Sequence, residues 1–411
     1  MTTDKQPIVL AFSGGLDTSF CVPYLIEQGY EVTTVFVDSG GVTDSDIKRI
    51  EERAVTLGAS KHETLSIGDA LWERVITPLL WSGQWYQNQY PLLCSDRYLI
   101  VEACLKYCLA HGHKNFAHGC TGMGNDQVRF DLAVMCQGDF NIVAPIREIQ
   151  RESGQVRDYE IAYLKERGFE VSDKVSRYSV NENLMGATIS GSEIDEWQTP
   201  ADDSYVLTKP PAERSHETMN LELTFEQGIV THFNGQSIDD SFTGEQLIQT
   251  LNTQGGQFGI GRDIYTGDTT IGLKGRIVFE APAISILTTA HRALEQCVLS
   301  KAQNRFKKSV ADKWVELVYE GLFYEPLKDD LEAFLASNQT QVTGKVTIEL
   351  SAGSVTAVAV NTENLLKDAG SVYAQSAAWT IEEAEGFIKL FGKSSVMAAR
   401  MRGNHLETKP S

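Results

Sequence analysis

Long apolar runs and positive charge are both scarce in this 411-residue chain. It contains no stretch of about 18 apolar residues, and its start, MTTDKQP, has no basic region followed by an apolar one. We therefore expect no membrane partner and a cytoplasmic location. The 36 Lys and Arg residues against 55 Asp and Glu residues give a net charge of −19, which disfavours a nucleic-acid partner held through its phosphates.

A disulfide pattern is also missing from the seven cysteines, whose number is odd and whose spacing fits no framework. They suit reduced thiols. Cys104, Cys108, His111 and His113 have the composition of a metal site. The two cysteines, however, lie four residues apart among Leu, Tyr and Ala, which is the spacing of a buried helix face. We therefore expect no metal ligand from protein side chains.

The first half of the chain does contain a regular alternation of strands and helices. The length of the whole chain predicts two or three domains. Alternating strands and helices indicate a parallel sheet covered on both faces, hence an α/β N-terminal domain. The expected strands are 8–12, 31–41, 115–119 and 140–145, and the expected helices are 17–28, 43–59, 68–82 and 95–111.

From about residue 170 the pattern changes to antiparallel hairpins. NLELTFEQGIVTHFNG alternates apolar and polar residues before a turn and a return strand, and KVTIELSAGSVTAVAV does the same. Helices are expected between these hairpins, at 283–300 and 306–327, so this part is an α+β domain. We place the domain boundaries at 1–168, 169–365 and 366–411.

The last domain is expected to be mainly one amphipathic helix. Thr380 and Glu383 form a capping-box pair ahead of an apolar stripe that includes Ile381, Ile388 and Phe391. This stripe predicts that the helix packs either on its own chain or on a neighbouring subunit.

The stretch AFSGGLDTSF, residues 11–20, leaves the first strand through two glycines and then places hydroxyl and carboxyl groups close together. Ser-Gly-Gly at the end of a parallel strand lets backbone N–H groups converge on an anion, and the following helix points its positive end at the same place. A tight turn with Asp17 as N-cap is the alternative. The full string resembles the loop of ATP pyrophosphatases, which binds the β,γ-pyrophosphate of ATP.

A second candidate loop, AHGCTGMGNDQVRFDL, residues 117–132, follows a later strand. Its glycines let a loop lie close to a ligand, and Asn125 and Asp126 can hold an ammonium or a carboxylate. Arg129 can pair with a carboxylate through two hydrogen bonds. A polar loop that merely caps a helix is the alternative. It is disfavoured because the chain also contains the predicted phosphate-binding turn of residues 11–20, called the phosphate turn below.

Together these two stretches resemble the argininosuccinate synthase family. YSVNENLMG, FGIGRDI, IGLKGR, AHRALE, ELVYEGLF and EGFIKL match in the same order, so the resemblance spans nearly the whole chain. It implies an ATP-dependent C–N ligase of arginine biosynthesis. ATP adenylylates the ureido oxygen of citrulline and releases pyrophosphate, and the amine of aspartate then displaces AMP. No protein nucleophile is needed, Mg²⁺ accompanies ATP, and the implied assembly is a homotetramer.

The same resemblance implies three groups of binding residues. Those for ATP are Ala11, Phe12, Ser13, Gly14, Gly15, Leu16, Asp17, Thr18, Ser19, Val37, His118 and Gly119. Those for aspartate are Thr121, Asn125 and Asp126. Those for citrulline are Tyr90, Ser95, Asn125, Arg129, Ser179, Thr188, Asp268 and Phe279.

The chain departs from the family at several of these places, so it is a divergent member. Met123 stands where the family has a lysine, and Thr188 replaces a serine. Gly267 and Phe279 align with a glutamate and a tyrosine at the amino-acid end of citrulline, and Asp268 can replace that glutamate from one residue along.

These departures leave several functions open. One is a homologous ligase that joins aspartate to another ureido- or amide-bearing acceptor. A tRNA-thiolating enzyme shares the phosphate turn, but the acidic charge and scattered cysteines disfavour it. A nucleotide-binding protein without catalysis is the remaining alternative. Lys274 and Arg276 are candidate phosphate contacts, or else residues of a solvated strand edge.

Overall fold

The computed structural model describes residues 5–403 apart from 153, 172–176, 369, 371, 373 and 374. The chain forms two compact units, Met1–Asn364 and Leu365–Ser411. The predicted division at residue 168 lies inside the first unit and stays a prediction. Residues 1–4, part of the stretch used to argue against a targeting segment, lie outside the described residues.

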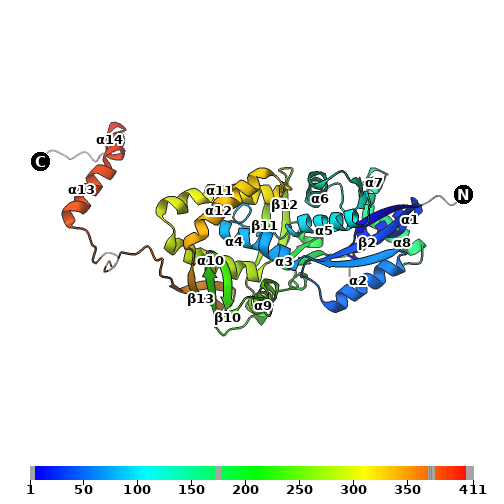
Figure 1. Cartoon of the computed structure of the whole chain (residues 1–411), viewed down its shortest axis with the longest axis horizontal. Coiled ribbons are helices and arrows are strands. Elements are labelled where there is room, and N and C mark those ends of the chain that lie inside the picture. Colours follow the sequence, from blue (N-terminus) through cyan, green and yellow to red (C-terminus); the bar gives the residue numbers. More distant parts are fainter. Residues whose placement is uncertain are drawn as a thin grey trace. The chain divides into compact units, whose positions relative to one another are not determined.

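The first unit begins with a five-stranded parallel sheet of strand order β3-β2-β1-β4-β5 (Figure 1). The predicted α/β fold class is thus confirmed, although the polar strand β3 was missed. The strands are β1 Gln6–Ala11, β2 Tyr30–Asp38, β3 Lys61–Ser66, β4 Asn115–Ala117 and β5 Asn141–Val143. The helices are α1 Leu16–Glu27, α2 Asp44–Thr56, α5 Asp96–Ala110, α6 Asn125–Gln137, α7 Pro145–Glu152 and α8 Val156–Glu166.

Both faces of β1 are buried from Ile8 to Ala11, which explains the unbroken apolar sequence of these four residues. Ile8 and Leu10 pack into a cluster with the side chains of α1 and α8. Val9 and Ala11 point the other way, into a cluster that includes the apolar face of α5. Because successive strand residues face opposite sides, a strand covered twice must be apolar throughout.

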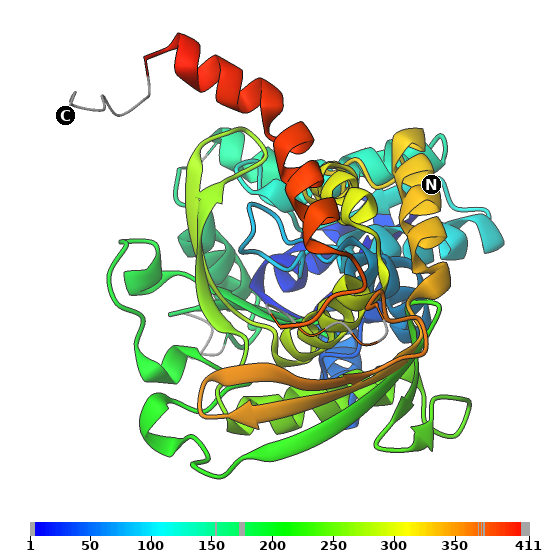
Figure 2. The same cartoon turned by 90° about the vertical axis from the view of Figure 1, so that its left-hand side faces the viewer.

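The rest of this unit carries two antiparallel sheets, as the α+β prediction requires. One has the order β10-β9-β8-β13-β14, and β13 pairs with β8 across distant parts of the chain (Figure 2). The other has the order β11-β12-β7-β6 and was not predicted. The strands are β6 Ser179–Asn183, β7 Gly186–Ser190, β8 Met219–Glu226, β9 Ile229–Phe233, β10 Gln236–Ser237, β11 Arg262–Asp268, β12 Lys274–Glu280, β13 Gly344–Ser351 and β14 Ser354–Asn361.

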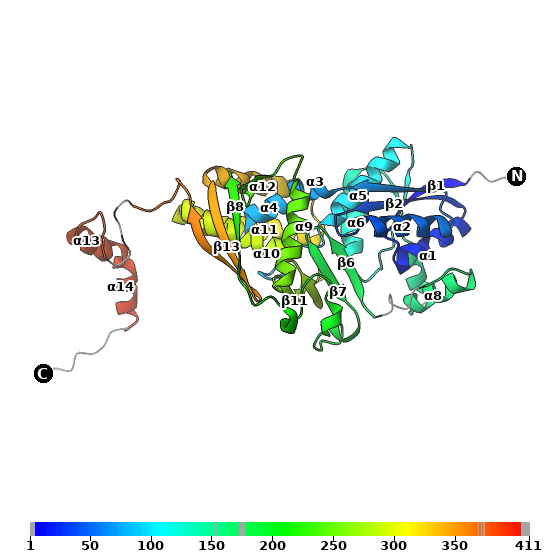
Figure 3. The same cartoon turned by 90° about the horizontal axis from the view of Figure 1, so that it is seen from below.

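Helices cover these sheets, and α10 lies against β13 and β14 (Figure 3). The helices are α3 Gly68–Leu71, α4 Thr77–Ser82, α9 Gly244–Gln257, α10 Pro282–Val298, α11 Lys301–Glu320 and α12 Pro326–Asn338. A π-helical segment, Trp72–Ile76, joins α3 to α4. Short 3₁₀ turns span Ser192–Ile194, Asp202–Ser204, Pro211–Glu213 and Gln339–Gln341.

Two predicted helices are divided in the structure. The helix expected at 306–327 ends at Glu320, because Gly321 adopts a left-handed conformation with φ of 100°. Pro326 then starts α12 at a first-turn position, where its missing N–H costs nothing. The helix expected at 68–82 is interrupted by the π-helical segment. The spacing of apolar residues does not predict the altered hydrogen bonding of such a segment.

The second unit contains α13 Ile381–Phe391 and α14 Lys393–Met401. The predicted capping box is confirmed: the Glu383 N–H donates to the Thr380 hydroxyl at 3.2 Å, and the Thr380 N–H donates to the Glu383 carboxylate at 2.8 Å. The apolar side chains of Phe387, Ile388 and Leu390 are exposed. Across the described residues, no helix is both long and apolar enough to cross a membrane.

Candidate functional site

The parallel sheet has one topological switch point, between β1 and β4. From β1 the chain moves outward to β2 and β3, then returns to the other side of β1 as β4. In open α/β sheets, ligands bind in the crevice at the carboxyl ends of strands where the order reverses. Both predicted loops, 11–20 and 117–124, follow these two strands directly.

The hydroxyl groups of the phosphate turn form hydrogen bonds within the turn itself. Gly14 adopts a φ of 75°, which favours glycine. The Thr18 hydroxyl lies 3.2 Å from the Ser13 hydroxyl and accepts from the Ser13 N–H at 3.3 Å. The Ser19 hydroxyl donates to the Gly14 carbonyl at 3.3 Å, and the Arg53 guanidinium donates to that hydroxyl at 3.3 Å. The turn thus faces the N-terminus of α1, where an anion is favoured.

The second loop approaches the first at Gly119, where a side chain would have little room. A Cβ on Gly119 would lie 3.1 Å from the Thr18 methyl carbon and 3.3 Å from the Thr18 nitrogen. The Gly122 N–H donates to the Gln150 side chain, and its carbonyl accepts from Gln127, both at 2.5 Å. The structure therefore brings together the two loops that the sequence assigned to ATP.

His118, a predicted ATP-binding residue, is buried, and its side chain bonds to other residues of the protein. Its Nε2 lies 2.9 Å from the Asp131 carboxylate, and its Nδ1 accepts from the Cys120 N–H at 3.2 Å. Burial lowers the pKa of His118 against the opposing effect of Asp131. Both ring nitrogens are engaged, and the His118 backbone N–H donates to the Val143 carbonyl at 3.2 Å.

A pair of carboxyl groups lies beneath the phosphate turn. The pKa of Glu160 is raised to about 8, mainly by burial and secondly by the nearby Asp17 carboxylate, and Arg157 opposes this rise. Burial also raises the pKa of Asp17. Because Glu160 is 1% exposed and hydrogen-bonds Asp17, the pair keeps one proton at neutral pH.

This proton predicts how stability depends on pH. The folded chain keeps it up to about pH 8, whereas an unfolded Glu loses it near 4.5, so the free energy of unfolding falls as pH rises between these values. We expect Glu160→Gln to match the parent below pH 4.5 and to be more stable at pH 8, at about 1.4 kcal/mol per pKa unit. Urea unfolding at pH 5.5 and 8 measures the difference, with exposed Asp158→Asn as control. Equal differences at both pH values would contradict the assignment.

Asp126 and Arg129 form the charged centre of the second predicted subsite. They lie three residues apart at the start of α6, and the Arg129 Nη1 donates to Asp126 at 2.7 Å. The Arg97 Nε donates to the other Asp126 oxygen at 3.2 Å. Burial alone would raise the pKa of Asp126, but Arg97 and Arg129 lower it. The carboxylate stays ionised while its side chain remains 37% exposed, so a positively charged group can reach it.

Arg129 also binds the backbone of a distant helix. Its Nε and Nη2 donate to the Tyr319 carbonyl at 3.0 and 2.8 Å, and its side chain is 3% exposed. Asn125 is similarly engaged, because its Oδ1 accepts from the Thr270 hydroxyl at 2.9 Å and its Nδ2 lies 3.4 Å from the Tyr319 hydroxyl. The tip of the β11–β12 hairpin and the end of α11 thus close over α6.

An aromatic cluster forms the next part of this region. Tyr86 stacks on Tyr319 with ring centres 3.6 Å apart, and Tyr265 lies 6.1 Å from Tyr86. Tyr90 packs edge-on against Phe279 at 5.8 Å. Burial raises the pKa of Tyr90, so it remains a neutral phenol.

The other predicted residues lie at varied depths. Ser95 is fully buried, and its hydroxyl donates to the Leu92 carbonyl at 2.7 Å. The Thr188 hydroxyl lies 3.5 Å from the Asn181 carbonyl, and Ser179 is exposed at the start of β6. Val37 is buried near the carboxyl end of β2. Their assignment to substrates stays a prediction.

The positions at which the sequence departs from the family pattern have the following surroundings in the structure. A Cβ on Gly267 would lie 2.2 Å from the Gln87 side-chain oxygen and 2.3 Å from the Tyr265 hydroxyl oxygen, so a larger residue there requires these side chains to shift. Asp268 is engaged by Lys274 and accepts from the Gln87 Nε2 at 2.5 Å. Met123 is 87% exposed. Arg276, a candidate phosphate contact, donates to the Gln198 carbonyl at 2.7 Å.

Sequence reasoning missed Arg97, Gln87 and Tyr319. Arg97 follows the predicted citrulline-binding residue Ser95 by two residues, so its charge was a usable signal. Gln87 and Tyr319 reach the site only through tertiary packing. In the described part of the chain, no group of three His, Cys, Asp or Glu residues could hold a metal ion.

Comparisons with known proteins agree with this geometry. A model described as arginosuccinate synthase N-terminal HUP domain matches residues 7–170, and one described as arginosuccinate synthase C-terminal domain matches residues 178–398. The chain is 56% identical over 397 residues to the argininosuccinate synthase of Xanthomonas campestris pv. campestris, covering 97% of this chain and 99% of that protein. It is 37% identical over 407 residues to the argininosuccinate synthase of Dictyoglomus thermophilum, covering 98% and 99%.

Proposed function

The chain belongs to the argininosuccinate synthase family, and from that premise we propose that it joins citrulline to aspartate with the use of ATP. The ureido oxygen of citrulline attacks the α-phosphorus of ATP, and pyrophosphate leaves. The aspartate amine then attacks the ureido carbon of the adenylylated citrulline, and AMP leaves. The product is argininosuccinate, so the chain is an enzyme of arginine biosynthesis.

The close approach of Gly119 to Thr18, where an added Cβ would lie 3.1 Å from the Thr18 methyl carbon, is the observation that carries this proposal. It places the phosphate turn beside the loop that leads into Asn125 and Asp126. ATP bound in the turn would therefore have its α-phosphate near the groups assigned to the other two substrates. Catalysis by positioning and charge stabilisation needs this proximity and no protein nucleophile.

The charged centre suits two amino-acid substrates. Asp126 is ionised, is partly exposed and can accept from the ammonium group of aspartate. Arg129 can donate to the carboxylate of citrulline if its bonds to the Tyr319 carbonyl are exchanged. Tyr90 would form one wall of the citrulline pocket.

Three further features belong to the same proposal. Mg²⁺ fits the phosphate turn through phosphate oxygens and water, because the turn offers hydroxyl groups while the Asp17 carboxyl group is hydrogen-bonded to Glu160. When bound, it would neutralise charge on the triphosphate. The exposed apolar side chains of α13 support a homotetramer in which this helix packs on other subunits. We place the enzyme in the cytoplasm.

Omission assays test the function. The purified protein is incubated with ATP, Mg²⁺, citrulline and aspartate, and AMP and pyrophosphate are measured. We expect argininosuccinate only when all substrates are present, and pyrophosphate but no argininosuccinate when aspartate alone is omitted. Absence of pyrophosphate release with citrulline would contradict the proposal.

A different acceptor is the second candidate, favoured by the surroundings of Gly267. This position has no carboxylate, and the neighbouring Asp268 is already neutralised by Lys274. The amino-acid end of citrulline therefore lacks one expected partner. Other ureido- and amide-bearing compounds should be compared by pyrophosphate release, and a higher kcat/KM than that of citrulline would favour them.

Gly119→Ala should weaken ATP binding specifically. The added methyl group would press on Thr18, and overpacking of this kind costs about 1–3 kcal/mol. We expect KM for ATP to rise about 5- to 150-fold. Gly124→Ala is the matched control, because its methyl group would meet only the Thr121 hydroxyl at an ordinary 3.4 Å. Equal effects of the two changes would contradict a role for the Gly119–Thr18 contact.

A further inference from the structure

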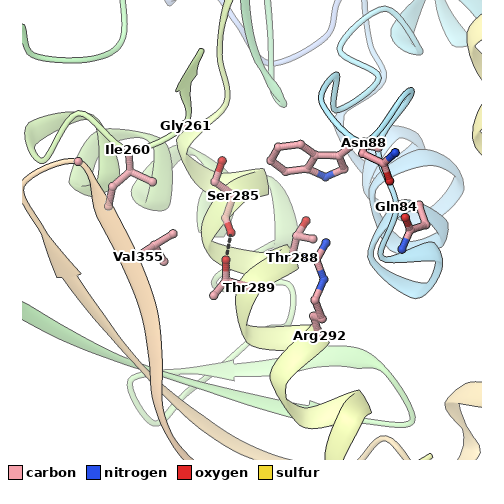
Figure 4. Close-up of a pocket in the computed structure, with 11 residues that line it drawn as sticks. Gln84, Asn88, Ile260, Gly261, Ser285, Thr288, Thr289, Arg292 and Val355 are labelled. Carbon is pink, nitrogen blue, oxygen red and sulfur yellow. Dashed lines mark hydrogen bonds between the residues drawn. The ribbon is translucent and has the colours of Figure 1, made fainter. Parts of the chain in front are cut away.

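A cavity of about 450 Å³ is lined in part by the loop of residues 84–88 (Figure 4). The same loop leads to Tyr90 in the predicted citrulline-binding region, which we call the acceptor site. One wall is the face of α10 that carries Thr288 and Arg292, and the opposite wall is the loop with Gln84 and Trp85. Val355 of β14 closes one side. Residues of the two ATP loops do not line it, so it is distinct from the site described above.

Two polar atoms of this lining are buried without a hydrogen-bond partner among the described residues: the Trp85 Nε1 and the Thr288 hydroxyl. The neighbouring Thr289 hydroxyl, in contrast, donates to the Ser285 carbonyl at 2.8 Å (Figure 4). Thr288 is 3% exposed. A buried polar group without a partner is costly, so a ligand that bonds to both atoms is favoured.

The charge of the lining selects the ligand. The Arg292 Nη2 donates to the Gly83 carbonyl at 2.9 Å, and no carboxylate in the described part of the chain pairs with this arginine. Glu295, one turn further along α10, is already bonded to Lys307. The indole N–H of Trp85 and the guanidinium group are donors only. The cavity therefore offers donors and positive charge beside apolar Val355.

We propose that this cavity binds a small organic carboxylate. The carboxylate oxygens would accept from Arg292, Trp85 and Thr288, and the carbon chain would lie against Val355. The volume is that of a site for a small molecule.

The cavity is connected to the acceptor site through one loop. Tyr86 and Tyr90 close this loop by mutual backbone hydrogen bonds of 2.8 and 3.0 Å. Trp85 and Asn88 line the cavity, whereas Gln87, between them, donates to Asp268 on the other side. A ligand that fixes Trp85 would also fix Tyr86 and Gln87. Carboxylate binding should therefore lower KM for the acceptor, an expectation that rests on the proposed function.

The binding test uses the full chain and butyrate as the probe. The indole N–H signal of Trp85, assigned by its loss in Trp85→Phe, is followed by NMR in ¹⁵N-labelled protein during titration. Butylammonium and butanol are controls with the same chain but no carboxylate. We expect a saturable shift with butyrate alone, and about 10- to 100-fold weaker binding in Arg292→Met.

Thr288→Val separates ligand binding from folding. It removes the unpartnered hydroxyl at constant shape, so its melting temperature should equal or exceed that of the parent while butyrate binding weakens. No shift with butyrate, or an unchanged shift in Arg292→Met, would overturn the proposal. So would a response to inorganic phosphate alone, or a signal that follows protein concentration instead of butyrate, which would indicate a second copy of the chain.

Kinetics then test the connection to the acceptor site. Saturating butyrate should lower KM for citrulline in the parent and not in Arg292→Met. Binding without a change in KM would show that the connection is wrong. If citrulline is not turned over at all, the proposed function fails, while the NMR titration still decides whether the cavity binds a carboxylate.

Discussion

Arg129→Met is expected to abolish most of the activity and to destabilise the fold. The change removes one hydrogen bond to Asp126 and two to the Tyr319 carbonyl. Because Asp126 is partly exposed and keeps Arg97, the free energy of unfolding should fall by about 1.5–3 kcal/mol, the range for a lost hydrogen bond to a charged group. If the guanidinium also binds the citrulline carboxylate through two bonds, kcat/KM for citrulline should fall about 10²- to 10⁴-fold. Pyrophosphate release and urea unfolding measure the two effects.

Two control variants separate the roles of Arg129. Arg129→Lys keeps the charge but not the forked geometry, so both effects should be intermediate. Arg97→Met removes the second partner of Asp126 together with the 2.6 Å bond to the buried Asp96, and it should raise KM for aspartate more than KM for citrulline. If Arg129→Met changes KM for aspartate alone, Arg129 acts through Asp126 and the citrulline assignment is wrong.

The phosphate turn and the pairing of Asp126 with Arg129 have signals that are local in the sequence. Glycines after a buried strand set the geometry of the turn, and the chain between Ser13 and Ser19 supplies its own hydrogen bonds. On α6, Asp126 and Arg129 are three residues apart, which is sufficient to place them on one face of a helix.

The closure over α6 was not predictable, because it depends on contacts between distant parts of the chain. Thr270 lies 145 residues from Asn125, and Tyr319 lies 190 residues from Arg129. Thr270 lies in the turn between β11 and β12, and the two edge strands of that sheet, β11 and β6, also gave a weak signal. In β11 only Tyr265 and Gly267 are buried, and most of β6 is exposed, so neither strand shows the apolar alternation that predicts a strand.

Lys307→Met is expected to produce a large loss of stability far from the reaction. Lys307 and Glu295 are 4% and 5% exposed and form an ion pair. The Gln339 Nε2 also donates to Glu295 at 3.0 Å, and the Gln339 Oε1 lies 2.8 Å from His291. Removing the lysine would leave the carboxylate buried with one neutral donor. The free energy of unfolding should fall by about 3–5 kcal/mol.

A double-mutant cycle in urea decides whether charge or packing causes that loss. Glu295→Leu alone should be destabilising, because it leaves the Lys307 ammonium buried. The combination of Lys307→Met and Glu295→Leu leaves no buried charge, and such replacements are often neutral or stabilising by about 1–4 kcal/mol. We therefore expect the double variant to be more stable than either single one. If instead the two losses add, the residues contribute independently through packing, because only coupled residues depart from additivity.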